Sequence, residues 1–278
     1  TRRPSPADLK KTPADPPAGE NELKQNPMVT GETEATEEPT IPPESNPFDM
    51  YDFQYNKHNY LYCLKQESYV GVDVSAFQHD INWKAVKQSG VDFAMLRLGY
   101  RGWGAKGTLV EDEYIQKNLQ GTLEAGMPIG VYFFSQATTE EEAREEALQL
   151  LEWIEGYDIT YPVVFDWEEV SDSDSRTKDT DGETVTKCAK VFCDIIEEAG
   201  YIPMTYGSPS KIYAGGLDLA QLQDWPFWLA HYTTGWVPTS FRYHYHMWQY
   251  SSSGTVPGIP VKVDLNLCLT DWSDWGKN

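Results

Sequence analysis

The stretch PVVFDWE, residues 162–168, decides how the rest of the chain is interpreted. Its apolar first part is typical of a buried strand, and two carboxylates follow at positions i and i+2. Alternate side chains of a strand share one face, so we expect Asp166 and Glu168 to point the same way and Trp167 to point opposite. Two acids side by side at the end of an apolar strand repel each other when both are ionised, which raises at least one pKa. Such a pair can supply a general acid near neutral pH.

An Asp-x-Glu sequence also occurs where a strand simply runs out into a solvated acidic loop. Glu169, Asp172 and Asp174 follow the motif here and fit that alternative. The meaning of the pair therefore depends on what the rest of the chain places beside it.

From residue 69 onward, short apolar runs alternate with longer segments of helical period, which is typical of βα units around a parallel sheet or barrel. The expected strands are 69–75, 93–100, 129–135, 163–168, 204–207, 227–232, 246–250 and 261–267. The expected helices are 82–89, 113–125, 139–155 and 183–199. Eight strands indicate a closed α/β barrel. The turns between the last three strands are too short for long helices, so we expect the final third to be irregular or partly antiparallel.

The N-terminal segment has a different composition from the rest of the chain. Residues 1–46 contain nine of the 18 prolines and no aromatic residue, so they cannot bury enough apolar surface to offset the entropy of ordering. We expect a disordered Pro/Thr/Glu-rich tether over 1–46, a connecting segment over 47–68 and the barrel domain over 69–278. Because the first residue is Thr, we expect a signal peptide or membrane anchor upstream and an extracellular or surface-tethered protein.

The net charge of −21 argues against nucleic acid as a partner, because an acidic surface repels phosphate. The histidines and cysteines show no metal or redox spacing, so no metal and no cofactor are expected. Cys188 and Cys193 are expected to be small buried side chains. A disulfide between Cys63 and Cys268 stays open.

Polar side chains gather near the ends of the expected strands, where barrel enzymes place their chemistry. Carboxylates come from the first, fourth and eighth strands, namely Asp73, Asp166 with Glu168, and Asp264. Converging acids of this kind fit a glycosidase, which needs a proton for the departing oxygen and stabilisation of an oxocarbenium-like ion. Side chains that could line a sugar groove are Tyr132, Tyr206, Tyr232, Trp248, Gln249 and Tyr250. An aromatic residue on a strand is more often part of the core, and Arg97 is expected to form a structural ion pair.

Several motifs occur in order over residues 69–272: GVDVS (71–75), FAMLR (93–97), GVYF (130–133), DWE (166–168), WLAHY (228–232), WQY (248–250) and VDLN (263–266). In this order they resemble the glycoside hydrolase family 25 lysozymes, the Chalaropsis-type muramidases. The resemblance implies an irregular, TIM-like (β/α)-barrel with five βα units followed by three further strands. It also implies cleavage of the β-1,4 bond between N-acetylmuramic acid and N-acetylglucosamine in peptidoglycan.

Carried over to this chain, the resemblance makes Glu168 the general acid and base. It makes Asp166 the carboxylate that orients or stabilises the reacting N-acetyl group of the substrate, and Asp73 and Asp264 flanking acids of the active site. The implied partner is a peptidoglycan glycan strand, with the protein acting as a monomer. A direct carboxylate nucleophile and an inverting attack by water stay open.

Two other functions stay open. A chitinase-like glycosidase would use the same Asp-x-Glu chemistry, but Val164 stands where that family's preceding Asp would be. A catalytically inactive glycan-binding module would keep the groove and lose the acid. Retention of all four carboxylates argues against the inactive module.

Overall fold

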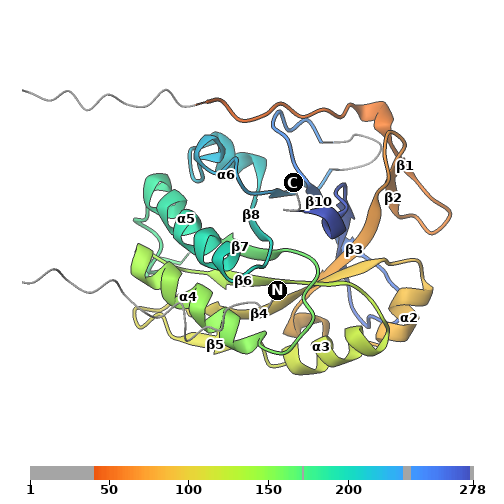
Figure 1. Cartoon of the computed structure of the whole chain (residues 1–278), viewed down its shortest axis with the longest axis horizontal. Coiled ribbons are helices and arrows are strands. Elements are labelled where there is room, and N and C mark those ends of the chain that lie inside the picture. The colour runs from red at the N-terminus through yellow and green to blue at the C-terminus, as the bar shows by residue number, and fades with distance from the viewer. Residues whose placement is uncertain (1–40, 171, 234–238, 276–278) are drawn as a thin grey trace, which may run out of the picture.

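The computed structural model describes residues 41–170, 172–233 and 239–275, and Figure 1 shows their arrangement. Eight strands close into a barrel in the order β3, β4, β6, β7, β8, β9, β10 and β11, with β11 bonded back to β3. Neighbouring strands run parallel from β3 to β10, and β11 is antiparallel to both of its neighbours. The predicted TIM-like barrel with a partly antiparallel final third is therefore confirmed.

The elements lie close to their predicted positions. The barrel strands are β3 (Tyr69–Val74), β4 (Phe93–Arg101), β6 (Ile129–Ser135), β7 (Val163–Trp167), β8 (Pro203–Gly207), β9 (Phe227–Ala230), β10 (Met247–Gly254) and β11 (Val263–Cys268). The helices are α2 (Trp83–Gln88), α3 (Ile115–Glu124), α4 (Glu140–Trp153), α5 (Gly182–Glu198) and α6 (Pro209–Tyr213). Sequence analysis did not predict α6, the short strand β5 (Leu109–Glu111) or the hairpin of β1 (Phe53–Tyr55) and β2 (Leu61–Cys63).

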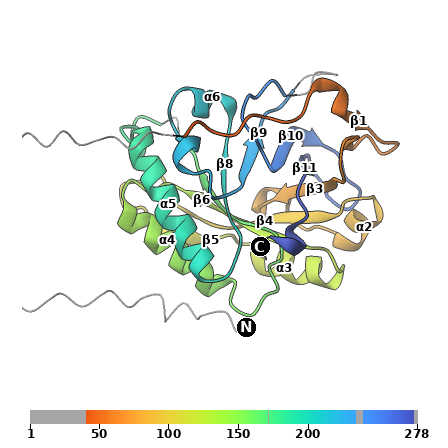
Figure 2. The same ribbon diagram turned by 45° about the horizontal axis from the view of Figure 1, so that its top comes forward.

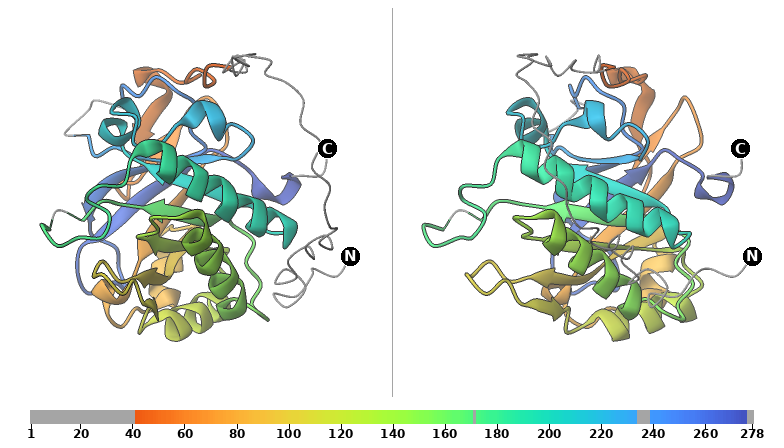
Figure 3. Two further views of the ribbon diagram at one scale, coloured as in Figure 1. Left: turned by 90° about the vertical axis from the view of Figure 1, so that its left-hand side faces the viewer. Right: turned by 60° about the vertical axis from the view of Figure 1, so that its left-hand side comes forward.

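Local sequence explains how the longest helices begin and which face they bury. The Thr139 side chain accepts a hydrogen bond from the Glu142 backbone N–H, and acidic residues fill the first turn of α4, where they favour the helix dipole. Cys188 and Cys193 lie on the buried side of α5 as free thiols. Figure 3 shows α4 and α5 lying side by side along the outside of the barrel.

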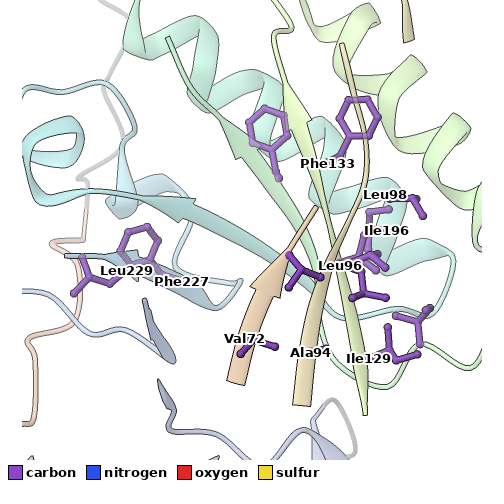
Figure 4. Close-up of a cluster of buried hydrophobic side chains, with 14 of the residues drawn as sticks. Val72, Ala94, Leu96, Leu98, Ile129, Phe133, Ile196, Phe227 and Leu229 are labelled. Atoms are coloured by element: carbon purple, nitrogen blue, oxygen red, sulfur yellow. The ribbon is translucent and has the colours of Figure 1, made fainter. Parts of the chain in front are cut away.

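Alternation along the strands separates two apolar layers. Side chains such as Ala94 and Leu96 on β4 point outward and pack under the helices, as Figure 4 shows. Phe93 and Met95, which alternate with them, join Val164 in a smaller cluster inside the barrel. The barrel interior is therefore a filled core near the N-terminal ends of the parallel strands. The next inward-facing residues lie toward the C-terminal ends of these strands and face the opening there, which we call the mouth.

The segment before the barrel packs against it. Ser45 forms a β-bridge with Tyr243, and the Asn46 backbone N–H donates to the Arg242 oxygen at 2.9 Å. Residues 1–40 of the predicted tether lie outside the described residues, whereas 41–46 run along the barrel. The composition of this segment did not predict the contact, because pairing between backbone groups requires no apolar side chains.

The connecting segment 47–68 carries the β1–β2 hairpin, which stands beside β10 in Figures 1 and 2. The Phe53 ring meets Trp248 edge-on at 5.5 Å between centroids. Cys63 and Cys268 are both buried free thiols, so the disulfide left open above is not formed. Among the described residues no helix is long and apolar enough to cross a bilayer.

Candidate active site

The four predicted acids meet at the barrel mouth because of strand alternation and one reversed strand. On β7, Asp166 follows the inward-facing Val164 by two residues and shares its face. Asp264 was expected near the C-terminal end of its strand, but it is the second residue of β11. It reaches the mouth because β11 runs antiparallel, which places Asp264 opposite Asp73 in the ladder.

Asp73 is buried and tied to two amides. Its Oδ2 accepts a hydrogen bond from Gln249 Nε2 at 2.8 Å and another from Asn266 Nδ2 at 2.7 Å. Burial raises the pKa of Asp73 to about 6, and these bonds oppose the rise because they favour the charged form. Burial and then the neighbouring Asp73 raise the pKa of Asp264 to about 8, and the two carboxyls are hydrogen-bonded. Asp73 and Asp264 therefore share one proton near neutral pH.

Asp166 and Glu168 form the second pair of acids. Asp166 is buried, its Oδ1 has no hydrogen-bond partner, and burial followed by the charge of Glu168 raises its pKa well above the usual range. Glu168 stays open to solvent at the mouth, while the surrounding wall raises the pKa of its carboxyl by partial desolvation. Trp167 points to the opposite face, as predicted, where its Nε1 donates to the Ala137 oxygen at 2.8 Å. This pair can hold a proton at neutral pH.

Backbone contacts fix the turn that carries Glu168. The Gln136 side-chain amide donates to the Glu168 backbone oxygen, and Lys211 Nζ donates to the Trp167 backbone oxygen. The ammonium of Lys211 also lies over the Trp167 ring, 4.7 Å from its centroid. The carbonyls of the last residue of β7 and of Glu168 are therefore both held, which limits where the Glu168 side chain can stand.

Lys211 is a functional candidate that sequence analysis missed. It lies on α6, four residues past the end of β8, and its cation is placed beside the acids. Burial lowers the pKa of Lys211 to about 8, although Asp166 and Glu168 oppose the shift. Its only signal in the sequence is a lone Lys in the turn after a strand, and a five-residue helix gives no amphipathic pattern that would place it.

We expect Lys211→Met to move the alkaline limb of the activity profile to higher pH. The ammonium lowers the pKa of Glu168 by stabilising its charge, so without it Glu168 keeps its proton to higher pH. The measurement is kcat/KM between pH 4 and 9, with Lys178→Met, an exposed lysine that donates to the Ser173 oxygen, as the matched control. An unmoved alkaline limb in Lys211→Met would contradict this coupling.

Four of the six predicted substrate-binding residues stand at the acid cluster. The Tyr206 and Tyr232 hydroxyls donate to Gln249 Oε1 at 2.9 and 2.8 Å, and Gln249 in turn bonds Asp73. The Tyr132 ring packs edge-on against Trp228, and Trp228 Nε1 donates to Asn266 Oδ1 at 2.9 Å. A continuous polar network therefore holds Asp73 from below.

Trp248 and Tyr250 are not brought to this cluster. They alternate with Gln249 on β10 and so point to the outside of the barrel. There Trp248 packs in the outer apolar layer, and the Tyr250 hydroxyl accepts a hydrogen bond from the Leu61 backbone N–H at 3.3 Å. Both residues support the β1–β2 hairpin rather than line the mouth.

Arg97 forms the structural ion pair that was predicted, with a partner that was not. Its Nε and Nη2 each lie 2.8 Å from Asp112 Oδ2. The same Asp112 oxygen accepts the Ala76 backbone N–H at 3.0 Å, which anchors the loop after β3. Arg97 therefore fixes the rim of the mouth through Asp112 and not through Asp73 or Asp264.

A cavity of about 620 Å³ opens beside Glu168 on the side of Trp167 and α6, and none of Asp73, Asp166 and Asp264 lines it. Trp167, Tyr206 and Lys211 line it together with the hydroxyls of Ser208 and Ser210. Over residues 41–170, 172–233 and 239–275, no group of three or more His, Cys, Asp or Glu side chains is placed to hold a metal ion.

The shared proton of Asp73 and Asp264 makes stability depend on pH. Both pKa values, about 6 and about 8, lie above the 3.8 of the free side chain, so the folded protein binds more protons than the unfolded chain from about pH 4 to pH 8. We expect Tm to fall as the pH rises through this range. Asp264→Asn should flatten the fall between pH 6 and 8, whereas Asp174→Asn, an exposed control, should not. Parallel Tm curves for the wild type and Asp264→Asn would contradict the assignment.

A closed barrel whose mouth holds two pairs of carboxylic acids with raised pKa values defines a glycoside hydrolase. The chain belongs to glycosyl hydrolases family 25, because the sequence model of that family matches residues 72–259. This finding confirms the family resemblance seen in the motifs.

Relatives of known sequence include a lysozyme and an uncharacterized protein. The chain is 28% identical over 212 residues to lysozyme M1 of Streptomyces globisporus, a match that covers 70% of this chain and 66% of that protein. It is 27% identical over 203 residues to the uncharacterized protein YegX of Escherichia coli K12, covering 71% of this chain and 68% of YegX.

Solved structures share the fold. The modular autolysin LytC of Streptococcus pneumoniae superimposes with a TM-score of 0.63 at 26% identity, covering 77% of this chain and 49% of LytC. This chain therefore spans about half the length of LytC. A family 25 glycosyl hydrolase of Bacillus anthracis, at 22% identity, matches in fold with a TM-score of 0.60 over 80% of this chain and 98% of that one.

Proposed function

We propose that this protein is a peptidoglycan hydrolase, an N-acetylmuramidase that cleaves the β-1,4 bond between N-acetylmuramic acid and N-acetylglucosamine. The observation that carries the proposal is the placement of Asp166 on β7 and of Glu168 directly after it, close enough to the Asp73–Asp264 pair for the charges to interact. Lysozyme M1 is among the similar sequences, and LytC has been solved with a synthetic peptidoglycan ligand. We further propose that the enzyme acts as a monomer outside the cell, where this polymer lies.

Glu168 acts first as the general acid. It is open to solvent at the end of β7, so the glycosidic oxygen of a bound strand can approach its carboxyl. The raised pKa keeps the proton in place until the C1–O4 bond breaks, when the proton moves to the departing oxygen. In the second step the same carboxylate removes a proton from the attacking water.

Asp166 orients the nucleophile supplied by the substrate. Its buried Oδ1 has no protein partner and is free to accept the N–H of the 2-acetamido group. That bond turns the acetamido carbonyl oxygen toward C1, where it forms a bond as C1–O4 breaks. Water then attacks C1, the ring formed by the acetamido group opens, and the configuration at C1 is retained.

Digestion of purified peptidoglycan tests the proposal. The products are reduced with borohydride and identified by mass spectrometry, so that the sugar carrying each new reducing end is known. New reducing N-acetylmuramic acid is expected. New reducing N-acetylglucosamine would overturn the assigned bond, and equal cleavage of unmodified N-acetylglucosamine polymers would favour a chitinase-like enzyme. Binding without any cleavage would favour the inactive module.

A further inference from the structure

The β1–β2 hairpin advances toward the mouth of the barrel. The Phe53 ring packs on Trp248, and two residues later the Tyr55 ring meets Tyr250 at 6.3 Å between centroids. Because β1 and β10 progress in the same direction, the turn 56–59 stands beyond the end of β1 on the mouth side. Figures 1 and 2 show the hairpin beside β10, and its residues precede the 72–259 segment that matches the family.

A cavity of about 550 Å³ lies between this hairpin and the rim that β9, β10 and β11 form. We call it the hairpin pocket. It adjoins the acid cluster along two strands. Thr233, which lines it, follows Tyr232, and Leu265 follows Asp264. Successive strand residues point to opposite faces, so Leu265 lies on the outer side of the wall whose inner side carries Asp264, and a glycan strand leaving the acids reaches the pocket across the rim.

The walls of the hairpin pocket have the chemistry of a sugar site. Tyr55, which is 38% exposed, supplies aromatic surface in front of the buried Tyr60 and Tyr250, and the hydroxyls of Ser253 and Thr255 stand at the rim. A pyranose ring presents apolar C–H faces that suit aromatic rings and hydroxyls that need hydrogen-bond partners. The volume also falls within the range of about 300–1,000 Å³ usual for small-ligand pockets.

Charge around the hairpin pocket differs from that of the chain as a whole. The chain carries a net charge of −21, yet the described residues that line this pocket include His58 and Lys262 and no carboxylate. Lys262 Nζ donates to Thr255 Oγ1 at 2.8 Å, which holds the cation at the rim. An acidic substituent on a sugar therefore meets favourable charge here, unlike at the four acids of the mouth.

We infer that the hairpin pocket is a distal subsite that binds an N-acetylated amino sugar of the same glycan strand, beyond the sugars held at the catalytic acids. The inference rests on the proposed function and adds to it a preference for long strands. A polymer that reaches the pocket gains contacts that a short fragment cannot make, so its affinity rises with length.

Blocking the pocket tests the inference. Ser253→Trp places an indole in the cavity at an exposed position, and Ser252→Trp adds the same bulk to the exposed neighbour that does not line the pocket. Both are made in the Glu168→Gln background, which permits binding to be measured without cleavage. The probes are peptidoglycan glycan strands of eight and of four sugars freed of stem peptides, titrated by calorimetry.

We expect Ser253→Trp to weaken binding of the eight-sugar strand about tenfold, which corresponds to about 1.4 kcal/mol, and to leave the four-sugar strand within twofold. Ser252→Trp should change neither. Tyr55→Ala, which removes one wall, should act like Ser253→Trp. Equal losses for both strand lengths, or no loss for the longer one, would overturn the inference.

The two proposals fail separately. If the wild type releases reducing N-acetylmuramic acid but Ser253→Trp shows no dependence on strand length, the muramidase stands and the distal subsite is wrong. If the wild type cuts nothing while Ser253→Trp still weakens only the longer strand, the distal subsite stands and the muramidase is wrong. Absence of binding for both strands would overturn both.

Discussion

Glu168→Gln is expected to lower kcat on peptidoglycan about 1,000-fold, within the range of about 10²–10⁴ that general acid–base catalysis contributes. Glutamine keeps the size of the side chain but has no proton to give at the moment the glycosidic bond breaks. Glu168 is open to solvent, and the contact that holds its turn comes through its backbone oxygen. Tm should therefore stay within a degree or two of the wild type.

The control is Glu169→Gln, which removes the same charge from the next residue, also exposed. Turnover is measured as reducing ends released per minute, with Tm recorded on the same samples. If both variants lose activity equally, net charge at the rim is responsible and not the proton of Glu168. Full activity in Glu168→Gln would remove Glu168 from the mechanism.

Arg101→Met is expected to destabilise the fold by roughly 3–5 kcal/mol, the usual cost of leaving a buried charge without its partner. Arg101 is 3% exposed, its Nε donates to Glu146 Oε1 at 2.7 Å, and its Nη1 donates to the Gly107 oxygen at 2.7 Å. Glu146 is fully buried on α4, so the pair ties β4 to that helix. For a chain of this size we expect Tm to fall by roughly 10 °C.

The loss should depend on pH. Burial raises the pKa of Glu146 to about 7 even with Arg101 beside it. Without Arg101 the pKa rises further, so folded Glu146 keeps its proton to higher pH, whereas in the unfolded chain it ionises near its ordinary value of 4.5. The cost of holding that proton in the folded state therefore grows as the pH rises. Arg101→Met should therefore be more damaging at pH 8.5. The double variant Arg101→Met/Glu146→Met removes both charges and should recover part of the loss. A single variant as stable as the wild type would contradict the account.

Much of the barrel was predictable because its signals are local. Val164 and Phe165 precede Asp166 on β7, and an apolar run of this kind depends only on neighbours in sequence. The helices followed from capping residues such as Thr139 and from their period. The four acids were found for the same reason, since each ends or begins an apolar run.

The missed parts depend on contacts between distant segments. Lys211 stands beside Glu168 only because α6 folds back over the end of β7. Asp112 was not expected as the partner of Arg97, because no short motif links them across β5. Trp248 and Tyr250 were predicted to bind sugar from their residue type, although they share the outward face that the hairpin covers.

The sequence by itself determined the order of the barrel strands and main helices, the family and the four acidic residues. Hydrophobic periodicity and motif order depend only on residues that are close together in the sequence. Only the tertiary structure decided which of the acids hold a proton near neutral pH. Burial, the reversed β11 that sets Asp264 against Asp73, and the cation of Lys211 fix those pKa values. These are effects of desolvation and of charges a few ångströms apart in space, and distance along the chain does not reveal them.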